Sequence, residues 1–360
     1  MSELAKLISD LVRINSVNPS LDPTGPGEGE IAVFVADWMK RAGLAVAMQE
    51  SAPGRPNVIG IRRGTGGGRS LMLNAHMDTV SFGGMADPLS GRVDGNRLYG
   101  RGSYDMKASL AAAMLAVADL GDEPLRGDVI VTAVTDEEYA SIGTQAIVRE
   151  YTADACVITE PSHLEMCIAH KGFVWAEIET HGTAAHGSLP DVGVDAITLM
   201  GPILTGIGEL DRRLRAGAGH PLLKTGSLHA SLIEGGTELS TYPDRCRVQI
   251  ERRTVPGETD AMVEQQLREL IGDAADLAMG ISRQPFEIGP EAELVQAMQA
   301  VVTKRLGRPA EIVGWGGWMD SALTSAAGIP SLVFGPTGHG AHADDEWIDL
   351  DSVQTCREIY

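Results

Sequence analysis

The sequence predicts an α/β protein, in which a mostly parallel sheet carries helices on both faces and a smaller α+β domain is inserted. The length of 360 residues is sufficient for two domains. Residues 31–160 alternate helical segments with continuous apolar strands, which is typical of parallel sheets packed between helices. Residues 173–283 instead show the order β-α-β-β-α-β of the ferredoxin-like split motif. We therefore expect one domain from residues 1–172 and 284–360, and an inserted domain from residues 173–283.

The elements of the larger domain follow from the spacing of its apolar residues. Helices have an apolar period near 3.6, whereas buried strands are short apolar runs bounded by polar or turn residues. The expected order is helix 31–43, strand 69–78, helix 107–120, strand 127–138 and strand 154–162, and after the insertion helix 291–307 and strand 330–338. In sheets of this kind, ligands bind beyond the carboxyl ends of the strands.

The inserted domain is expected to contain four strands and two helices. In chain order these are strand 172–182, helix 194–214, strands 225–233 and 244–254, helix 258–274 and strand 275–286. Strict alternation of apolar and polar residues in GFVWAEIETHG indicates a strand with one buried face, which suits an antiparallel sheet covered on one side.

The composition excludes several classes of partner. With 43% hydrophobic residues, 22% charged residues and no apolar run of about 18 residues, no membrane association is expected. A formal net charge of −20 without a basic stripe would repel phosphate backbones, so we expect no nucleic-acid partner. Residues 1–17 form an amphipathic pattern without a signal-peptide core, which predicts a cytoplasmic location. The four cysteines are scattered and are expected to be buried thiols.

Ionisable residues stand where the predicted strands of the larger domain end. They are His76 and Asp78, then Asp136, Glu137 and Glu138, then Glu160, and finally His342, while Asp105 lies in a glycine-rich loop before a helix. Because the carboxyl ends of parallel strands share one edge, these side chains should converge. Carboxylates at a few ångströms from one another disfavour ionisation unless a cation lies between them. Histidine and carboxylate donors without cysteine suit a pair of zinc ions or similar divalent metals.

Each residue also has an ordinary structural interpretation. His76 and Asp78 could be a satisfied hydrogen-bonded pair at a strand end. Asp105 could be the N-cap of the helix that follows it. Glu137 and Glu138 could form a solvated turn, Glu160 could simply end a strand, and His342 could be exposed in its loop. A metal site is nevertheless favoured, because all of these residues occur together at the predicted strand ends.

The chain resembles the M20 metallopeptidase family, which includes acetylornithine deacetylase, succinyl-diaminopimelate desuccinylase, aminoacylase and carboxypeptidases that release glutamate. The resemblance runs nearly from end to end. It is carried by RINSVNPS, NAHMDTV, YGRGSYDMKA, TDEE, TEPS, KGFVWAEIETHGTAAHGSLP, YPDR, ERRTVPGE and AHADDEW, in the family's order. It implies a zinc-peptidase-like catalytic domain and an inserted domain that serves as lid and dimerisation surface.

The resemblance implies two divalent metal ions per chain, with zinc expected and cobalt or manganese as alternatives. The implied ligands are Asp105 as a bridge, His76 and Glu160 on one ion, and Glu138 and His342 on the other. His339 competes with His342, but AHADDE places His342 at the family's position. The resemblance also implies a cis peptide bond between Asp105 and Met106.

Catalytic roles are implied for three further residues. Glu137 would be the general base for a metal-bridging water. Asp78 would bond to the ring of His76 and fix its tautomer. His186 would reach across a homodimer interface formed by the inserted domain and steady the oxyanion in the partner's site. The alternative for His186 is a surface position in a turn.

Three positions are expected to contact substrate. Arg253 aligns with an arginine that binds a substrate carboxylate, a task that suits a planar guanidinium, whereas Arg252 is expected to be solvated. Ser240 stands where the family commonly has asparagine, so one amide contact is shortened or lost. Gly317 belongs to the loop GWGGWMDSA, in which Trp318 and Met319 replace small hydroxyl residues. These two residues would either favour an apolar substrate group or belong to the core.

The expected function is hydrolysis of the amide bond in an N-acyl amino acid or a related substrate with a free carboxylate. A dipeptidase or carboxypeptidase is the enzymatic alternative. A non-catalytic binding homologue is a third hypothesis. The presence of every expected metal ligand and of the expected general base argues against it.

Overall fold

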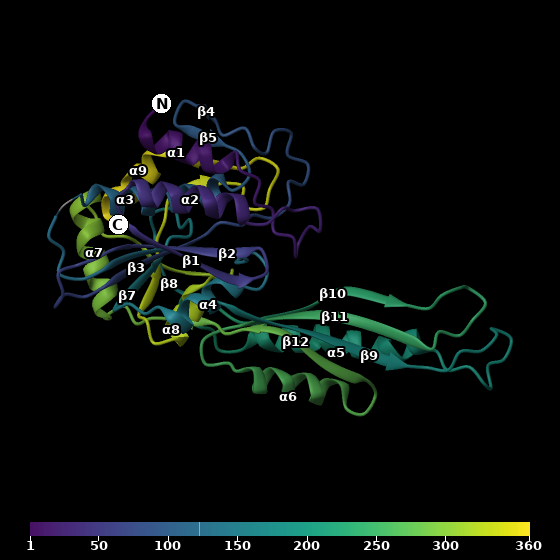
Figure 1. The fold of residues 1–360 in the computed structure, drawn as a ribbon. Coiled ribbons are helices and arrows are strands. Elements are labelled where there is room, and N and C mark those ends of the chain that lie inside the picture. The colour runs from purple at the N-terminus through teal and green to yellow at the C-terminus, as the bar shows by residue number, and fades with distance from the viewer. Residues whose placement is uncertain (122) are drawn as a thin grey trace. The chain divides into compact units, whose positions relative to one another are not determined.

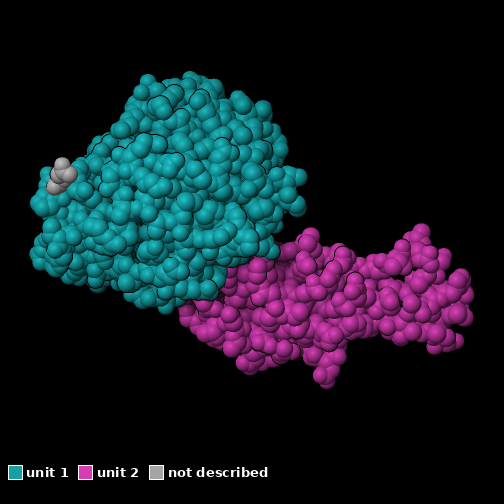
Figure 2. Space-filling model, viewed as in Figure 1, with its two compact units in different colours: residues 1–168, 288–313, 319–360 teal, residues 169–287, 314–318 magenta. Residues whose placement is uncertain are grey.

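The computed structural model describes residues 1–121 and 123–360, which form two compact units (Figures 1 and 2). The first unit contains residues 1–168, 288–313 and 319–360, and the second contains residues 169–287 and 314–318. The boundaries expected from sequence, 173 and 283, therefore differ by a few residues from those of the second unit. The short segment 314–318, which the chain adds to the second unit on its return, was not expected from the sequence.

A mixed sheet with a parallel centre has most of its strands in the first unit. The strand order is β1-β2-β6-β3-β7-β15-β8-β13, with β14 paired to β8. Strand β3 pairs in parallel with β6 and with β7, and β15 pairs in parallel with β7, whereas β1, β2, β8 and β13 are antiparallel to their neighbours. The bounds are β1 Ala45–Ala52, β2 Arg55–Arg62, β3 Leu71–His76, β6 Val129–Val134, β7 Ala155–Ile158, β8 Met166–His170, β13 Phe286–Glu287, β14 Ile312–Trp315 and β15 Ser331–Val333.

Helices cover this sheet on both faces. Figure 1 shows α2 and α3 on one face and α4 and α8 on the other. The bounds are α1 Glu3–Val12, α2 Gly29–Arg41, α3 Ala108–Asp119, α4 Ile142–Glu150, α7 Glu293–Leu306, α8 Ser321–Ala326 and α9 Leu350–Ile359. Helix α3 is buried almost all round, which explains its run of alanines: small side chains let it approach both the sheet and α9. The predicted α/β architecture is thus confirmed.

A small antiparallel sheet of order β16-β17-β5-β4 also belongs to the first unit. Its strands are β4 Arg92–Asp94, β5 Arg97–Tyr99, β16 Gly338–His339 and β17 Trp347–Asp349. The turn that follows β5 leads into the π-helical turn η1, Ser103–Lys107, which ends at the start of α3. The Asp105–Met106 peptide bond in this turn is cis, as the family resemblance implied.

The second unit has the chain order β9, α5, β10, β11, α6, β12 and the sheet order β10-β11-β9-β12. This is the expected β-α-β-β-α-β motif, with all pairs antiparallel. The bounds are β9 Gly172–His181, α5 Ala196–Ala216, β10 Ser227–Gly235, β11 Arg245–Thr254, α6 Asp260–Ile271 and β12 Asp276–Arg283. Apolar residues from one face of the sheet and from both helices form its core.

Several sequence expectations on element length were too long. Strand β6 ends at Val134, so Asp136 to Glu138 lie in the turn after it, and β7 ends at Ile158, two residues before Glu160. All four cysteines are buried free thiols, as expected. Among the described residues, no helix combines the length and apolar character needed to cross a bilayer.

Candidate metal centre

The carboxyl edge of the parallel strands brings the predicted ligands together. His76 is the last residue of β3, and β3 lies between β6 and β7, whose following turns carry Glu137, Glu138 and Glu160. Asp105 enters from η1, and His342 comes from the loop between β16 and β17. Because β3, β6 and β7 are parallel, their carboxyl ends lie at one edge of the sheet, and the side chains that follow these ends are brought together there.

Two histidines face the two carboxylate oxygens of Asp105. The Nε2 atom of His76 lies 3.1 Å from Asp105 Oδ1 and 3.4 Å from Glu160 Oε1. The Nε2 atom of His342 lies 2.8 Å from Glu138 Oε2 and 3.5 Å from Asp105 Oδ2. Asp105 therefore stands between two histidines, each of which also approaches one further carboxylate.

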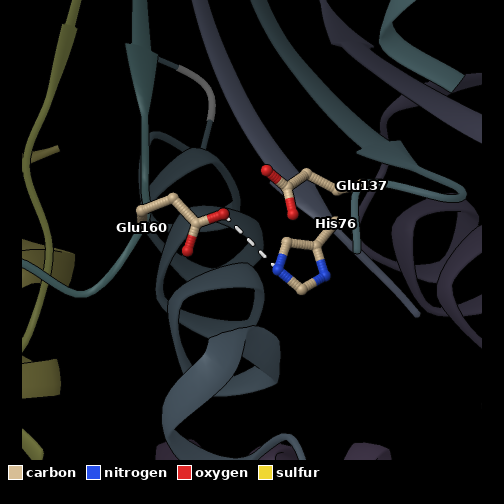
Figure 3. Close-up of side chains that lie close together, drawn as sticks. All are labelled: His76, Glu137 and Glu160. Carbon is tan, nitrogen blue, oxygen red and sulfur yellow. Dashed lines mark ion pairs between the residues drawn. The ribbon is translucent and has the colours of Figure 1, made fainter. Parts of the chain in front are cut away.

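Possible donor atoms lie close enough together to hold a cation. One donor atom from each of His76, Glu137 and Glu160 lies within 4.8 Å of the others, and the same holds for His76, Asp105 and Glu138. Figure 3 shows the carboxylates of Glu137 and Glu160 turned toward the ring of His76. Imidazole nitrogens and carboxylate oxygens at this spacing, without a thiolate, form a donor set that suits zinc or a similar divalent ion.

Electrostatics also indicate that a positive charge belongs here. Burial raises the pKa of Glu137 well above its ordinary value, and the nearby charge of Glu160 raises it further. Burial likewise raises the pKa of Glu160, although His76 opposes this. Burial disfavours the charged ring of His76, yet the charge of Glu160 and a hydrogen bond to Asp105 raise its pKa above the ordinary value. Hydrogen bonds to Asp105 and Glu138 raise the pKa of His342 to about 10. Protons are thus held where divalent cations could replace them.

The ordinary structural interpretations fail for several of these residues. Asp105 does not cap α3, whose N-cap residue is Lys107 and has no side-chain cap. The side chain of Glu138 is only 5% exposed, so the turn after β6 is not solvated there. His339 lies away from the cluster, 3.5 Å from Asp345 and stacked on Trp347.

Asp78 contacts the centre differently from the expected arrangement. The Nδ1 atom of His76 lies 3.0 Å from the main-chain carbonyl of Asp78, and its ion-pair distance to the carboxylate is 3.6 Å. The carboxylate of Asp78 instead accepts the backbone N–H groups of Glu137, at 3.1 Å, and Glu138, at 3.2 Å. The residue therefore orients the ring through its backbone and holds the Glu137–Glu138 turn through its side chain.

A buried polar network behind Asp78 was missed in the sequence. The side-chain amide of Asn18 donates to Asp78 at 2.8 Å and to Asp136 at 3.0 Å. The guanidinium of Arg55 bonds to both carboxylate oxygens of Glu28 and lies 3.1 Å from Asp136. The available signal was an arginine at the start of the apolar strand RPNVIG, since a charge there must be paired when it is buried.

The residues expected to contact substrate lie in the second unit. Arg253 on β11 bonds to Glu251 and lies 5.4 Å above the ring of Phe173. His186 is exposed and 2.8 Å from Ser188, and its turn is hydrogen-bonded to Ser240 through Gly187. Gly317 is exposed with open space around it. Their roles in substrate binding remain predictions.

Two expectations around this group need correction or refinement. Arg252, expected to be solvated, is 1% exposed and pairs with Glu258, because alternate residues of β11 face the core of the second unit. Met319 is buried and belongs to the core. The ring of Trp318 is half-buried and meets Phe173 edge-on, with centroids 6.3 Å apart.

Comparison with known proteins identifies the family. Residues 72–360 match the model of peptidase family M20/M25/M40. An acetylornithine deacetylase from Proteus mirabilis is 28% identical, covering 98% of this chain and 94% of its own length. Another from Photorhabdus laumondii is 30% identical, covering 91% and 87%.

Among solved structures, an M20 family metallo-carboxypeptidase from Sulfolobus solfataricus has the same fold. The two structures superimpose with a TM-score of 0.82 at 17% sequence identity. The match covers 100% of this chain and 98% of the carboxypeptidase chain. This chain therefore belongs to peptidase family M20/M25/M40 and is a metal-dependent hydrolase, because the family model matches most of its length and its relatives are acetylornithine deacetylases.

Proposed function

We propose that the protein is a dinuclear-metal amidohydrolase that cleaves the amide bond of an N-acyl amino acid or a related substrate with a free carboxylate. The observation that carries this proposal is the placement of Asp105, whose two oxygens each face a histidine that also faces another carboxylate. A carboxylate whose two oxygens each approach a histidine suits a pair of neighbouring cations.

In this proposal the ligands divide as the geometry suggests. Asp105, His76 and Glu160 would hold one ion, and Asp105, Glu138 and His342 would hold the other. Zinc is the ion we propose, with cobalt and manganese as alternatives that offer similar preferences for nitrogen and oxygen. When bound, two such ions act as Lewis acids and lower the pKa of a water molecule.

Glu137 is the residue proposed to move the proton. It lies next to Glu138, and its carboxylate faces the same space as His76 and Glu160 (Figure 3). As general base it accepts a proton from the attacking water and delivers it to the nitrogen that leaves. Asp78 keeps Glu137 in place by accepting its backbone N–H.

Substrate recognition is assigned to the second unit. Arg253 would bind the substrate carboxylate, with Ser240 and Gly317 as further contacts and His186 steadying the oxyanion from the partner chain of a homodimer. A homodimer is supported by apolar side chains exposed on α5 and β10, namely Ile197, Leu199, Leu204, Leu232 and Ile233. The half-buried ring of Trp318 favours an apolar group on the substrate.

A dipeptidase or carboxypeptidase is the second candidate, because the structural neighbour from Sulfolobus solfataricus is named a metallo-carboxypeptidase. The two activities differ in the group on the amino side of the scissile bond. A panel of N-acetyl amino acids and dipeptides, with hydrolysis followed directly, separates them.

The test of the proposed centre is metal analysis combined with Glu137→Ala. This variant should lose turnover while retaining about two metal ions per chain, because the base is not a proposed ligand. Glu150→Ala, at the exposed end of α4, is the matched control and should behave as wild type. Unchanged turnover in Glu137→Ala would refute the role of the base, and a wild type that binds no metal would refute the centre.

A further inference from the structure

Glu346 collects an unusual number of hydrogen bonds on one buried carboxylate. The residue is 2% exposed and stands directly before β17, four positions after His342. Its Oε2 atom accepts from Arg101 Nη1 at 2.7 Å and from Gly102 N at 3.0 Å, and its Oε1 atom accepts from Tyr104 N at 2.8 Å and from Asp105 N at 3.1 Å. Three of these four donors are main-chain N–H groups of the turn that contains Asp105.

Strand pairing explains how Glu346 reaches this turn. Trp347 of β17 pairs with Tyr99 of β5, and the next step of the ladder is a bond from Gly100 N to the carbonyl of Glu346, at 3.3 Å. The side chain of Glu346 therefore lies against residues 100–105 as they leave β5. The register of two short strands fixes this contact.

Glu346 is also the last residue of the loop between β16 and β17, which carries His342. That loop is tight, with Gly340 and His342 at φ values of 86° and 61° and a bond from Ala343 N to Gly340 O at 2.9 Å. Glu346 thus connects the short loop that carries one histidine to the turn that carries Asp105. The side chains of His342 and Asp105 approach one another to 3.5 Å in the candidate centre.

An ordinary buried ion pair would account for only one of the four bonds. Arg101 alone could neutralise Glu346, and such a pair needs no main-chain partners. The three main-chain N–H groups belong to a turn where η1 has non-helical dihedral angles at Asp105, so regular helical bonding does not fix its path. Both oxygens of Glu346 are used to hold that path.

We propose that Glu346 is a positioning residue that holds the Asp105 turn and the His342 loop in one arrangement and so sets the affinity of the centre for its cations. The inference rests on the proposed function of that centre. Residues that orient metal ligands from behind commonly change metal affinity by about 10–100-fold when they are replaced.

The experiment compares wild type with Glu346→Gln in two measurements. The first is Co²⁺ affinity by competition with a chelator, together with the visible absorption of bound Co²⁺. The second is hydrogen exchange of residues 100–107 in the metal-free protein. Glutamine has the same shape, but its NH₂ group would face two N–H donors, so the turn should loosen. We expect about 10–100-fold weaker Co²⁺ binding, an altered absorption spectrum and faster exchange.

Asp128→Asn is the matched control. Its carboxylate also accepts from an arginine, Arg63, and from a main-chain N–H, that of Gly64, but it lies before β6, at the opposite end of that strand from Glu137. The control should bind Co²⁺ as wild type does. If Glu346→Gln does not fold, Glu346→Asp keeps the charge, shortens the reach and should weaken binding in the same direction.

Two failures are distinguishable. A Glu346 variant that binds Co²⁺ as tightly as wild type, or whose turn exchanges no faster, overturns this inference alone. A wild type that binds no cation overturns the proposed function itself.

Discussion

Replacement of Arg55 by methionine is expected to destabilise the first unit strongly. Arg55 lies between Glu28 and Asp136, and the side chains of these two carboxylates are 0% and 2% exposed. Methionine retains much of the volume but leaves two buried carboxylates without their cation. Breaking a buried pair by removing one partner costs about 3–5 kcal/mol, because the remaining charge has lost its hydration without compensation.

The assay is urea denaturation of the metal-free protein, followed by far-ultraviolet circular dichroism. Arg63→Met is the control, since Arg63 pairs with Asp128 but its side chain is 66% exposed. Such an exposed pair is worth at most about 1 kcal/mol. Combining Arg55→Met with Glu28→Gln should recover part of the loss, because one uncompensated charge is removed. An Arg55→Met variant no less stable than the Arg63→Met control would show that Arg55 does not compensate the two buried carboxylates.

Three further outcomes are expected. Metal affinity should rise with pH, because the proposed ligands Glu160 and His76 both have raised pKa values and must release protons to receive cations. Affinity that does not change with pH in calorimetric titrations would contradict the assignment. In the metal-free protein, Glu137 and Glu160 bind protons more tightly in the folded state than in the unfolded state, because their pKa values in the folded state are raised. The thermal stability of the metal-free protein should therefore fall as the pH rises above 4.5, the ordinary pKa of glutamate. A rise in thermal stability over that range would contradict the raised pKa values. Replacing Asn18 with leucine removes one of the two donors to Asp78 Oδ2 and one of the two donors to Asp136 Oδ1. The loss of these hydrogen bonds to buried carboxylates should cost about 1–3 kcal/mol in the same urea assay, and an unchanged midpoint would argue against the network.

The positions of the candidate ligands could be read from local patterns. His76, Glu137, Glu138 and Glu160 each follow an apolar run that becomes a strand of the parallel centre, and parallel strands place their carboxyl ends together. Cysteine burial followed from the scattered spacing in the same way. The β1–β2 hairpin was missed because β1 has no fully buried residue and so lacks the apolar alternation of a strand.

The buried polar residues that hold those ligands in place could not be predicted from local sequence patterns. Arg55 finds Glu28 and Asp136 at sequence separations of 27 and 81 residues, and Glu346 finds Asp105 at a separation of 241. Such pairs depend on strand register and on the path of loops. The burial of Arg252 likewise depends on which face of β11 the core of the second unit covers.

The α/β class, the inserted β-α-β-β-α-β unit and the strand ends that carry the acidic and histidine side chains follow from the apolar pattern of the chain. The complete fold was needed to find that Asp78 holds a turn through its carboxylate and a ring through its carbonyl, and that Glu346 contacts two segments of the centre. Apolar periodicity is a local property of the chain, whereas a buried polar group is satisfied by whichever donor the complete fold brings to it.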